Sequence, residues 1–220
     1  MIRYARLAAE GGAAVVVFPE LSLTGYPPQD LVEKPAFLRQ AASELQRLAS
    51  ETAHLRLTVI RGTVEPSHAT TGARVLNLAT VIARGAVQFQ QQKMLLPTYD
   101  VFDDARYFLP AEKQDLVTLA GSPVALTICE DAWNDKQYWE RRLYRRDPVD
   151  ELARRAAPRT ASANSLEFTR VSKLDTVWAA IALDEIAVGP ARRRAVFVNG
   201  GRGPNSSPTL LNHPLSEVRA

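Results

Sequence analysis

Apolar residues along this chain fall into two patterns, which together predict packed layers of helices and strands. Residues 13–18 and 122–129 are largely apolar runs of strand length, typical of strands buried on both faces. Residues 36–53 instead repeat apolar side chains at helical spacing, which predicts an amphipathic helix with one buried stripe. The mixture of the two patterns favours the α/β class.

The segments between these runs add shorter elements. A helix over residues 3–10 is expected to end at Gly11-Gly12, and Gly85 is expected to join two strands into a hairpin. We expect strands over 57–64, 74–83, 86–92 and 195–199, helices over 139–156 and 174–188, and loops over 21–35, 99–113 and from 200 to the end. The pattern weakens after residue 156. We therefore expect one domain over 1–156 and, over 157–220, a degraded remainder of the same domain with a partly disordered tail.

Composition and charge exclude several classes of protein. The 220 residues are 46% hydrophobic with a net charge of +3, values ordinary for a globular protein. Without a basic tail beside it, we interpret the arginine-rich run at 141–146 as the solvated face of a helix rather than a phosphate contact. A single cysteine allows no internal disulfide, and no apolar stretch fits a membrane span or signal peptide. We expect a cytoplasmic protein without nucleic-acid or membrane partners.

The single cysteine, Cys129, ends an apolar run and is followed by two carboxylates. Glu20 and Lys93 lie at or near the ends of two other apolar segments. Strand ends are rigid and open onto loops, so a thiol placed there can act as a nucleophile. Singly, the three residues have ordinary interpretations as an inert core thiol, a surface carboxylate and a sheet-edge lysine. Their combined spacing and flanking sequence favour a shared site.

The chemistry of such a site follows from its residue types. A thiol attacks a carbonyl carbon only as a thiolate or with a base beside it. The three histidines lie outside the expected strand ends, so we predict Glu20 as the base and Lys93 as the positive charge that stabilises an oxyanion. This predicts attack on an amide or nitrile carbon. A lone cysteine with distant histidines provides no set of metal ligands, so no metal is expected.

Three segments carry a family resemblance: Phe18–Leu31, which contains Gly-Tyr-Pro-Pro-Gln-Asp-Leu, Lys93–Phe108, which contains Tyr-Asp-Val-Phe-Asp-Asp, and Ile128–Trp133. Together they resemble the amidase domain of the nitrilase superfamily. More narrowly, they are similar to the glutaminase domain of glutamine-dependent NAD synthetases. The resemblance runs from about residue 3 to about residue 153 and implies a four-layer α-β-β-α sandwich, incomplete here at both ends.

The same resemblance implies roles for individual residues. Glu20 matches the general base, Lys93 the lysine that stabilises the intermediate, and Cys129 the nucleophile. Tyr99 and Glu130 match positions that shape the glutamine pocket. Ser165 is expected to be a further substrate-binding residue, in a remnant of the loop that holds the α-carboxylate of glutamine.

An activity also follows from the resemblance. The domain is expected to hydrolyse L-glutamine through a cysteine thioester and to pass ammonia to a synthetase domain, which amidates deamido-NAD. The glutaminase step is expected to need no cofactor, whereas ATP and deamido-NAD belong to the synthetase domain. The Ser-Gly-Gly-x-Asp-Ser loop of that domain is absent from these 220 residues. A homo-oligomer is expected for the intact enzyme.

The chain departs from the family pattern in three places. It begins inside the first helix without the family's opening strand, Val177-Trp178 stands where an arginine is expected, and the segment from Gly200 is altered. Two alternatives therefore stay open: a stand-alone nitrilase-type amidase acting on another small amide, and a non-catalytic truncated remnant. The Tyr-Pro-Pro-Gln-Asp-Leu segment argues against the first, whereas the missing strand and the altered loop argue for the second.

Overall fold

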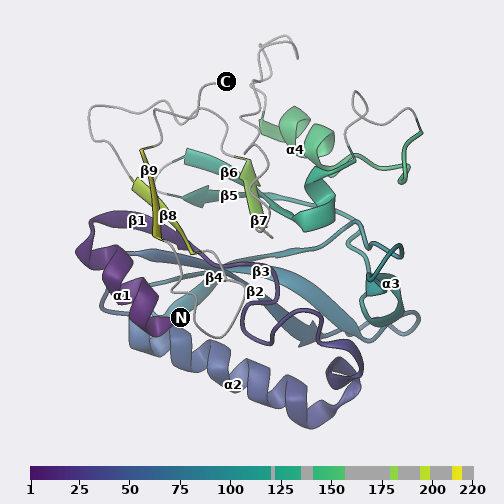
Figure 1. Ribbon diagram of the computed structural model, residues 1–220, viewed down its shortest axis with the longest axis horizontal. Coiled ribbons are helices and arrows are strands. Elements are labelled where there is room, and N and C mark those ends of the chain that lie inside the picture. Colours follow the sequence, from purple (N-terminus) through teal and green to yellow (C-terminus); the bar gives the residue numbers. More distant parts are fainter. Residues whose placement is uncertain (120–121, 135–140, 157–178, 183–193, 199–209, 215–220) are drawn as a thin grey trace.

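The computed structural model describes residues 1–119, 122–134, 141–156, 179–182, 194–198 and 210–214 (Figure 1). The helices are α1 (Ile2–Glu10), α2 (Pro35–Thr52), α3 (Asp104–Tyr107) and α4 (Pro148–Ala156), with 3-10 turns η1 (Gln29–Glu33) and η2 (Cys129–Ala132). The strands are β1 (Ala13–Val17), β2 (Thr58–Pro66), β3 (Val75–Ala83), β4 (Ala86–Gln92), β5 (Leu116–Leu119), β6 (Ser122–Ile128), β7 (Ala179–Ala182), β8 (Arg194–Val198) and β9 (Leu210–Pro214).

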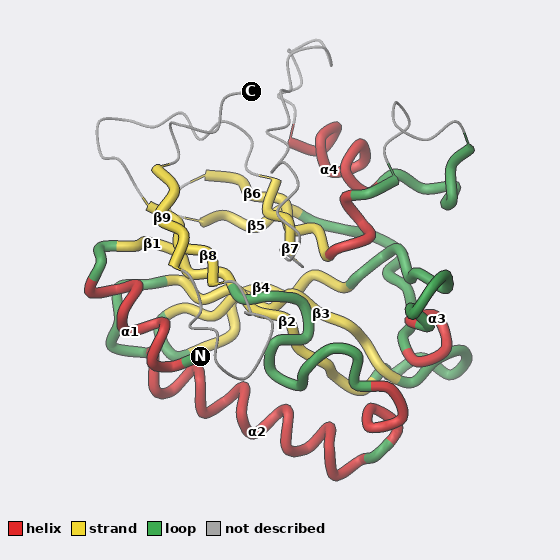
Figure 2. The backbone as a smooth tube through the Cα atoms, in the orientation of Figure 1, coloured by secondary structure: helices red, strands yellow, loops and turns green. Residues whose placement is uncertain are grey.

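Two sheets lie face to face between two layers of helix. One sheet has the strand order β4-β3-β2-β1-β8-β9, and the other has the order β5-β6-β7. Helices α1 and α2 cover the outer face of the larger sheet, and α4 lies on the outer side of the smaller one (Figures 1 and 2). This α-β-β-α arrangement confirms the expected fold class.

Two apolar cores hold the layers together. The core between the helices and the large sheet includes Val16 and Val59, and the core between the two sheets includes Val17 and Ile60. Successive residues of a strand point to opposite faces, so a strand that supplies both cores must be apolar at every position. The continuous apolar run at 13–18 is therefore explained by its place inside the sandwich, where β1 pairs in parallel with both β2 and β8.

Helix α2 follows the predicted amphipathic pattern closely. It begins at Pro35, whose missing N–H costs nothing at the first helical position. Its buried stripe consists of Ala41, Leu45, Leu48, Ala49 and Thr52. Helical spacing places these side chains on one face, and that face packs against the large sheet.

The helix predicted over 139–156 is wrong over residues 141–147, and residues 139 and 140 lie outside the described part of the chain. Helix α4 begins only at Pro148, and residues 141–147 form bends and irregular chain. Proline is well tolerated at a helix start and clashes inside a helix, which fixes the start of α4 there. The interpretation of 141–146 as a helix face is consequently wrong. Arg146 instead pairs with Glu151 of α4.

Three other predicted elements differ from the structure. Residues 179–182, inside the helix expected over 174–188, form strand β7, and residues 210–214 of the expected tail form β9. Each pairs antiparallel with a neighbour, β6 and β8 respectively, and tertiary pairing of this kind overrides local propensity. The loop expected over 99–113 contains the short helix α3, and β5 was not predicted. Apart from β7, β8 and β9, the remainder expected over 157–220 lies outside the described residues.

Gly62 of β2 allows the chain after β1 to pass close to the backbone of β2. A Cβ atom placed on Gly62 would lie 2.0 Å from the backbone nitrogen of Leu21 and 2.6 Å from the carbonyl carbon of Glu20. Both obstructing atoms belong to backbone, so neither can turn aside as a flexible side chain would. The position of Glu20 therefore depends on a glycine in the neighbouring strand.

We expect Gly62→Ala to lower the free energy of unfolding by about 3 kcal/mol, because the added methyl group displaces packed backbone. Gly11→Ala is the matched control. Its backbone φ is −73° and its Cβ would lie 3.4 Å from the Leu7 carbonyl oxygen, so its effect should stay within about 1 kcal/mol. Urea unfolding of both variants measures the difference. Equal effects at the two glycines would contradict the close approach at Gly62.

Candidate active site

Glu20, Lys93 and Cys129 come from three distant parts of the chain and meet in the buried interior. Glu20 follows β1, Lys93 directly follows β4, and Cys129 directly follows β6. The Lys93 Nζ atom lies 2.8 Å from Oε1 of Glu20, and both side chains are 0% exposed. Lys93 and Glu20 are also close enough to Cys129 for their charges to act on its thiol. The structure thus brings together the three residues that the sequence singled out, although their catalytic roles stay predictions.

A second carboxylate completes the surroundings of Lys93. The Lys93 ammonium donates to Oδ2 of Asp104 at 2.7 Å, and the Tyr26 hydroxyl donates to the other oxygen of Asp104 at 3.3 Å. Asp104 is the first residue of the short helix α3. Asp104 was not predicted from the sequence, although it stands in the Tyr-Asp-Val-Phe-Asp-Asp stretch that carries part of the resemblance. Lys93 is thus held between two carboxylates.

The two oxygens of the Glu20 carboxylate have different surroundings. Oε1 accepts hydrogen bonds from Lys93 Nζ and, at 2.6 Å, from Nδ2 of Asn77 in β3. Oε2 is equally buried and has no hydrogen-bond partner among the described residues. One oxygen therefore orients the carboxylate, and the other is available to accept a proton.

The electrostatics of the group follow from burial and charge. Burial alone lowers the pKa of Lys93, but the carboxylates of Glu20 and Asp104 outweigh it and hold this pKa above its usual range. Burial raises the pKa of Glu20, and the nearby Lys93 opposes the rise. Burial, followed by the negative charge of Glu20, raises the pKa of the Cys129 thiol. At neutral pH the resting site thus holds a protonated lysine and a neutral thiol beside a carboxylate with increased basicity.

The backbone turns sharply at the nucleophile candidate. Strand β6 ends at Ile128, one residue earlier than predicted, and Cys129 begins the turn η2 with φ at +47°. Leu21, directly after Glu20, has a similar φ of +49°. Residues other than glycine rarely adopt this left-handed conformation, and where they do, the surrounding structure must stabilise it. Both corners thus hold chemically active side chains at fixed strand ends.

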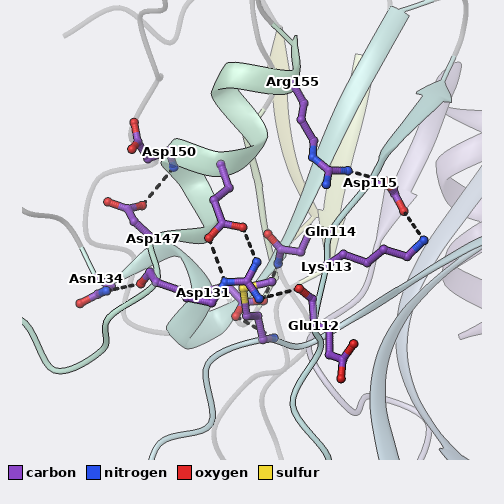
Figure 3. A network of polar contacts seen from close by, with 12 residues as sticks. Glu112, Lys113, Gln114, Asp115, Asp131, Asn134, Asp147, Asp150 and Arg155 are labelled. Atoms are coloured by element: carbon purple, nitrogen blue, oxygen red, sulfur yellow. Dashed lines mark hydrogen bonds and ion pairs between the residues drawn. The ribbon is translucent and has the colours of Figure 1, made fainter.

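Asp131 ties the corner of Cys129 to the segment that follows Lys93. One of its carboxylate oxygens accepts from the backbone N–H groups of Met94 and Leu95, at 3.0 and 2.7 Å. The other accepts from the Ile128 N–H and from the side-chain amide of Gln114 (Figure 3). Burial raises the pKa of Asp131 to about 7, although its backbone donors oppose the rise. No role of Asp131 was predicted from the sequence, and only its tertiary contacts reveal one.

Two of the three predicted substrate-binding residues lie together beside Cys129. The Tyr99 hydroxyl donates to Oε2 of the buried Glu130 at 2.7 Å. The Tyr99 ring meets Phe102 edge-on at 5.7 Å between ring centres, so aromatic contacts support it from the side. The third predicted residue, Ser165, lies outside the described residues.

The arrangement can move a proton and stabilise negative charge. It combines a buried thiol, a carboxylate with one unbonded oxygen and an ammonium group that stays charged. Within the described ranges, no group of three or more His, Cys, Asp or Glu side chains is placed to hold a metal ion. No helix in that part of the chain is long and apolar enough to cross a membrane.

Comparisons with known proteins agree with this geometry. Residues 1–146 match the carbon-nitrogen hydrolase family. The glutamine-dependent NAD(+) synthetase of Synechocystis sp. is 41% identical over 144 residues, which are 64% of this chain and 26% of that protein. The chain thus spans about a quarter of the length of this relative.

Solved structures resemble this chain in fold. A glutamine-dependent NAD+ synthetase from Acinetobacter baumannii, solved with ADP, has a TM-score of 0.52 at 31% identity, covering 60% of this chain and 24% of that one. A Nesterenkonia amidase of the nitrilase superfamily has a TM-score of 0.52 at 20% identity, covering 71% and 54% of the two chains, and shows likeness of fold alone. The family match extends over about two thirds of the sequence and includes Glu20, Lys93 and Cys129. This chain belongs to the carbon-nitrogen hydrolase family.

Proposed function

We propose that this chain is the glutaminase part of a glutamine-dependent NAD synthetase, which hydrolyses the carboxamide of L-glutamine. The observation that carries the proposal is the buried Glu20–Lys93 pair beside Cys129, with one Glu20 oxygen unbonded. The names of the relatives support the choice of substrate. A stand-alone amidase is the other candidate within the family, and a panel of small amides distinguishes the two.

The first half of the reaction forms a thioester. The Cys129 sulfur attacks the carboxamide carbon while its proton passes to Oε2 of Glu20. The raised pKa of the thiol makes this transfer simultaneous with the attack, because little thiolate exists beforehand. The electron pair of the carbonyl bond moves onto oxygen, and the ammonium of Lys93 stabilises this charge. The carbon–nitrogen bond then breaks, and ammonia leaves with the proton returned by Glu20.

The second half hydrolyses the thioester. Water gives a proton to Glu20 as its oxygen attacks the thioester carbon, and the same lysine stabilises the second oxyanion. The carbon–sulfur bond breaks, the thiol regains its proton from Glu20, and glutamate leaves. Burial favours this cycle, because Glu20 with its raised pKa is a stronger base than an exposed carboxylate.

The proposed function also includes substrate-binding residues, a synthetase partner and an oligomeric state. Tyr99 and Glu130 shape the glutamine pocket, and Ser165 helps to hold the α-carboxylate. Ammonia passes to a synthetase domain that uses ATP and deamido-NAD, while the glutaminase step uses no cofactor. The intact enzyme is a homo-oligomer.

The alkylation rate of Cys129 by iodoacetamide should depend on pH in a specific way. Because burial and Glu20 raise the thiol pKa, the rate should still rise between about pH 8 and about pH 10 without a plateau. Glu20→Gln removes a negative charge that raises the pKa of the Cys129 thiol, and it keeps the positive charge of Lys93, which lowers this pKa. The variant should therefore be alkylated about tenfold faster at about pH 8. Glu44→Gln, on the exposed face of α2, should behave like the native chain. A plateau below pH 8, or slower alkylation of Glu20→Gln, contradicts this electrostatic arrangement.

Intact-mass measurement tests the function itself. After incubation with a diazo-ketone analogue of glutamine, we expect one adduct on the native chain and none on Cys129→Ala. Glu20→Gln should also lose the adduct. The reaction with the glutamine analogue needs proton transfer by Glu20, whereas alkylation by iodoacetamide does not. A chain that melts cooperatively but forms no adduct would exclude the glutaminase proposal for this chain, and the absence of a cooperative melt would support the non-catalytic alternative.

A further inference from the structure

Asn77 contacts both members of the Glu20–Lys93 pair. Its side-chain Nδ2 donates to Oε1 of Glu20 at 2.6 Å, and its backbone carbonyl oxygen accepts from the Lys93 N–H at 2.9 Å. The Lys93 ammonium donates to the same Glu20 oxygen at 2.8 Å, so each of the three residues contacts the other two. One residue of β3 thus holds the carboxylate through its side chain and the lysine through its backbone.

The position of Asn77 is fixed by the large sheet. Strand β3 lies between β2 and β4, and Asn77 is paired with Val64 of β2. Alternate residues of a strand share a face, so Asn77 points to the same side as Ala79 and Val81, which belong to the core between the two sheets. A strand paired on both sides allows little backbone movement. The amide donor therefore meets Glu20 at a constant place.

Packing alone does not explain an amide at this position. Asn77 is 1% exposed, and its Oδ1 atom is buried without a hydrogen-bond partner among the described residues. An unpaired buried acceptor is destabilising, and an apolar side chain on the same face of β3 would avoid that loss. The hydrogen bond to Glu20 is the contact that gives the amide a purpose.

Two donors on one oxygen define the orientation of the Glu20 carboxylate. The terminal torsion of a glutamate side chain is broad, so a carboxylate held by a single flexible lysine can rotate and exchange its two oxygens. The second donor, on β3, opposes this rotation because the strand does not follow it. Oε2 is left as the oxygen without a hydrogen-bond donor in the described part of the chain.

We propose that Asn77 is a positioning residue, which selects Oε2 of Glu20 as the oxygen that accepts the Cys129 proton and holds Glu20 and Lys93 in their relative places during the reaction. This inference rests on the proposed function, because it concerns the base of the same reaction. Asn77 acts through Glu20, so its effect should be on turnover rather than on substrate binding.

The same hydrogen bond affects the strength of the base. Burial raises the pKa of Glu20, Lys93 opposes the rise, and the Asn77 hydrogen bond opposes it as well, because it stabilises the ionised carboxylate. The titratable groups whose charges interact with Glu20 are Lys93, Asp104, Cys129 and Tyr26. A substitution of Asn77 leaves all of them in place. Without this donor the pKa of Glu20 should rise further, and activity that needs the deprotonated base should be lost at a higher pH on acidification.

The test measures ammonia release from L-glutamine as a function of pH. For Asn77→Leu, we expect the acid limb of the kcat/KM profile to move to higher pH by about one unit, because a hydrogen bond to a charged group is lost. The maximal kcat should fall about tenfold, with KM changed less than about twofold.

Thr80→Val is the matched control. Thr80 is a buried polar residue of the same strand, but it lies on the opposite face from Asn77 and contacts Gln90. This variant should keep the acid limb, the kcat and the KM of the native chain.

A second variant and a second reagent separate positioning from a loss of structure. Asn77→Val removes the same donor with a smaller side chain suited to a strand, so it should move the acid limb in the same direction without overpacking. Iodoacetamide should alkylate Cys129 in both Asn77 variants within about twofold of the native rate at about pH 8, because alkylation does not use the base.

Each outcome decides the inference. An unshifted acid limb in an Asn77 variant that melts cooperatively overturns it and leaves the proposed function intact. An equal shift in Thr80→Val, or the absence of a cooperative melt in both Asn77 variants, also overturns it and shows a structural role instead. No ammonia release by the native chain overturns both the inference and the proposed function.

Discussion

The buried ammonium group of Lys93 is the constraint on which the site depends. An ion taken out of water loses solvation free energy of several kcal/mol, even after the protein relaxes around it. Here the oxygens of Glu20 and Asp104, at 2.8 and 2.7 Å, replace that water. The two carboxylates come from the chain after β1 and from α3, whereas the lysine follows β4. The charge is therefore compensated only when these three segments meet, which couples correct folding to assembly of the site.

The turn that begins at Cys129 links the buried Lys93 group to the residues around it. Glu130 accepts from Tyr99, Asp131 holds the backbone that follows Lys93, and Asn134 holds the backbone at 144 and 146. Each of these side chains is buried, so an unmade hydrogen bond there costs more than one at the surface. A short segment beside Cys129 thus fixes the backbone after Lys93, the Glu130 carboxylate and the support from α4 relative to one another.

Sequence reasoning succeeded where a local pattern was sufficient. The buried run of β1, the stripe of α2 and the hairpin of β3 and β4 follow from the spacing of apolar residues, and the chemically active strand ends follow from their flanking residues. Asn77 and Asp104 were not predicted, because each acts through a side chain that another element brings beside it. The predictions for 141–147, 179–182 and 210–214 were wrong, because a proline fixes the start of α4 and strand pairing forms β7 and β9.

The mechanism depends most directly on a thioester between Cys129 and the glutamyl group. Hydroxylamine intercepts such a thioester and converts it to a hydroxamate, so the decisive measurement is γ-glutamyl hydroxamate formed from L-glutamine and hydroxylamine. The mechanism predicts steady formation of hydroxamate by the native chain, in competition with glutamate, and none by Cys129→Ser. Ammonia release from glutamine without any hydroxamate, or equal hydroxamate from Cys129→Ser, would contradict a cysteine thioester as the intermediate.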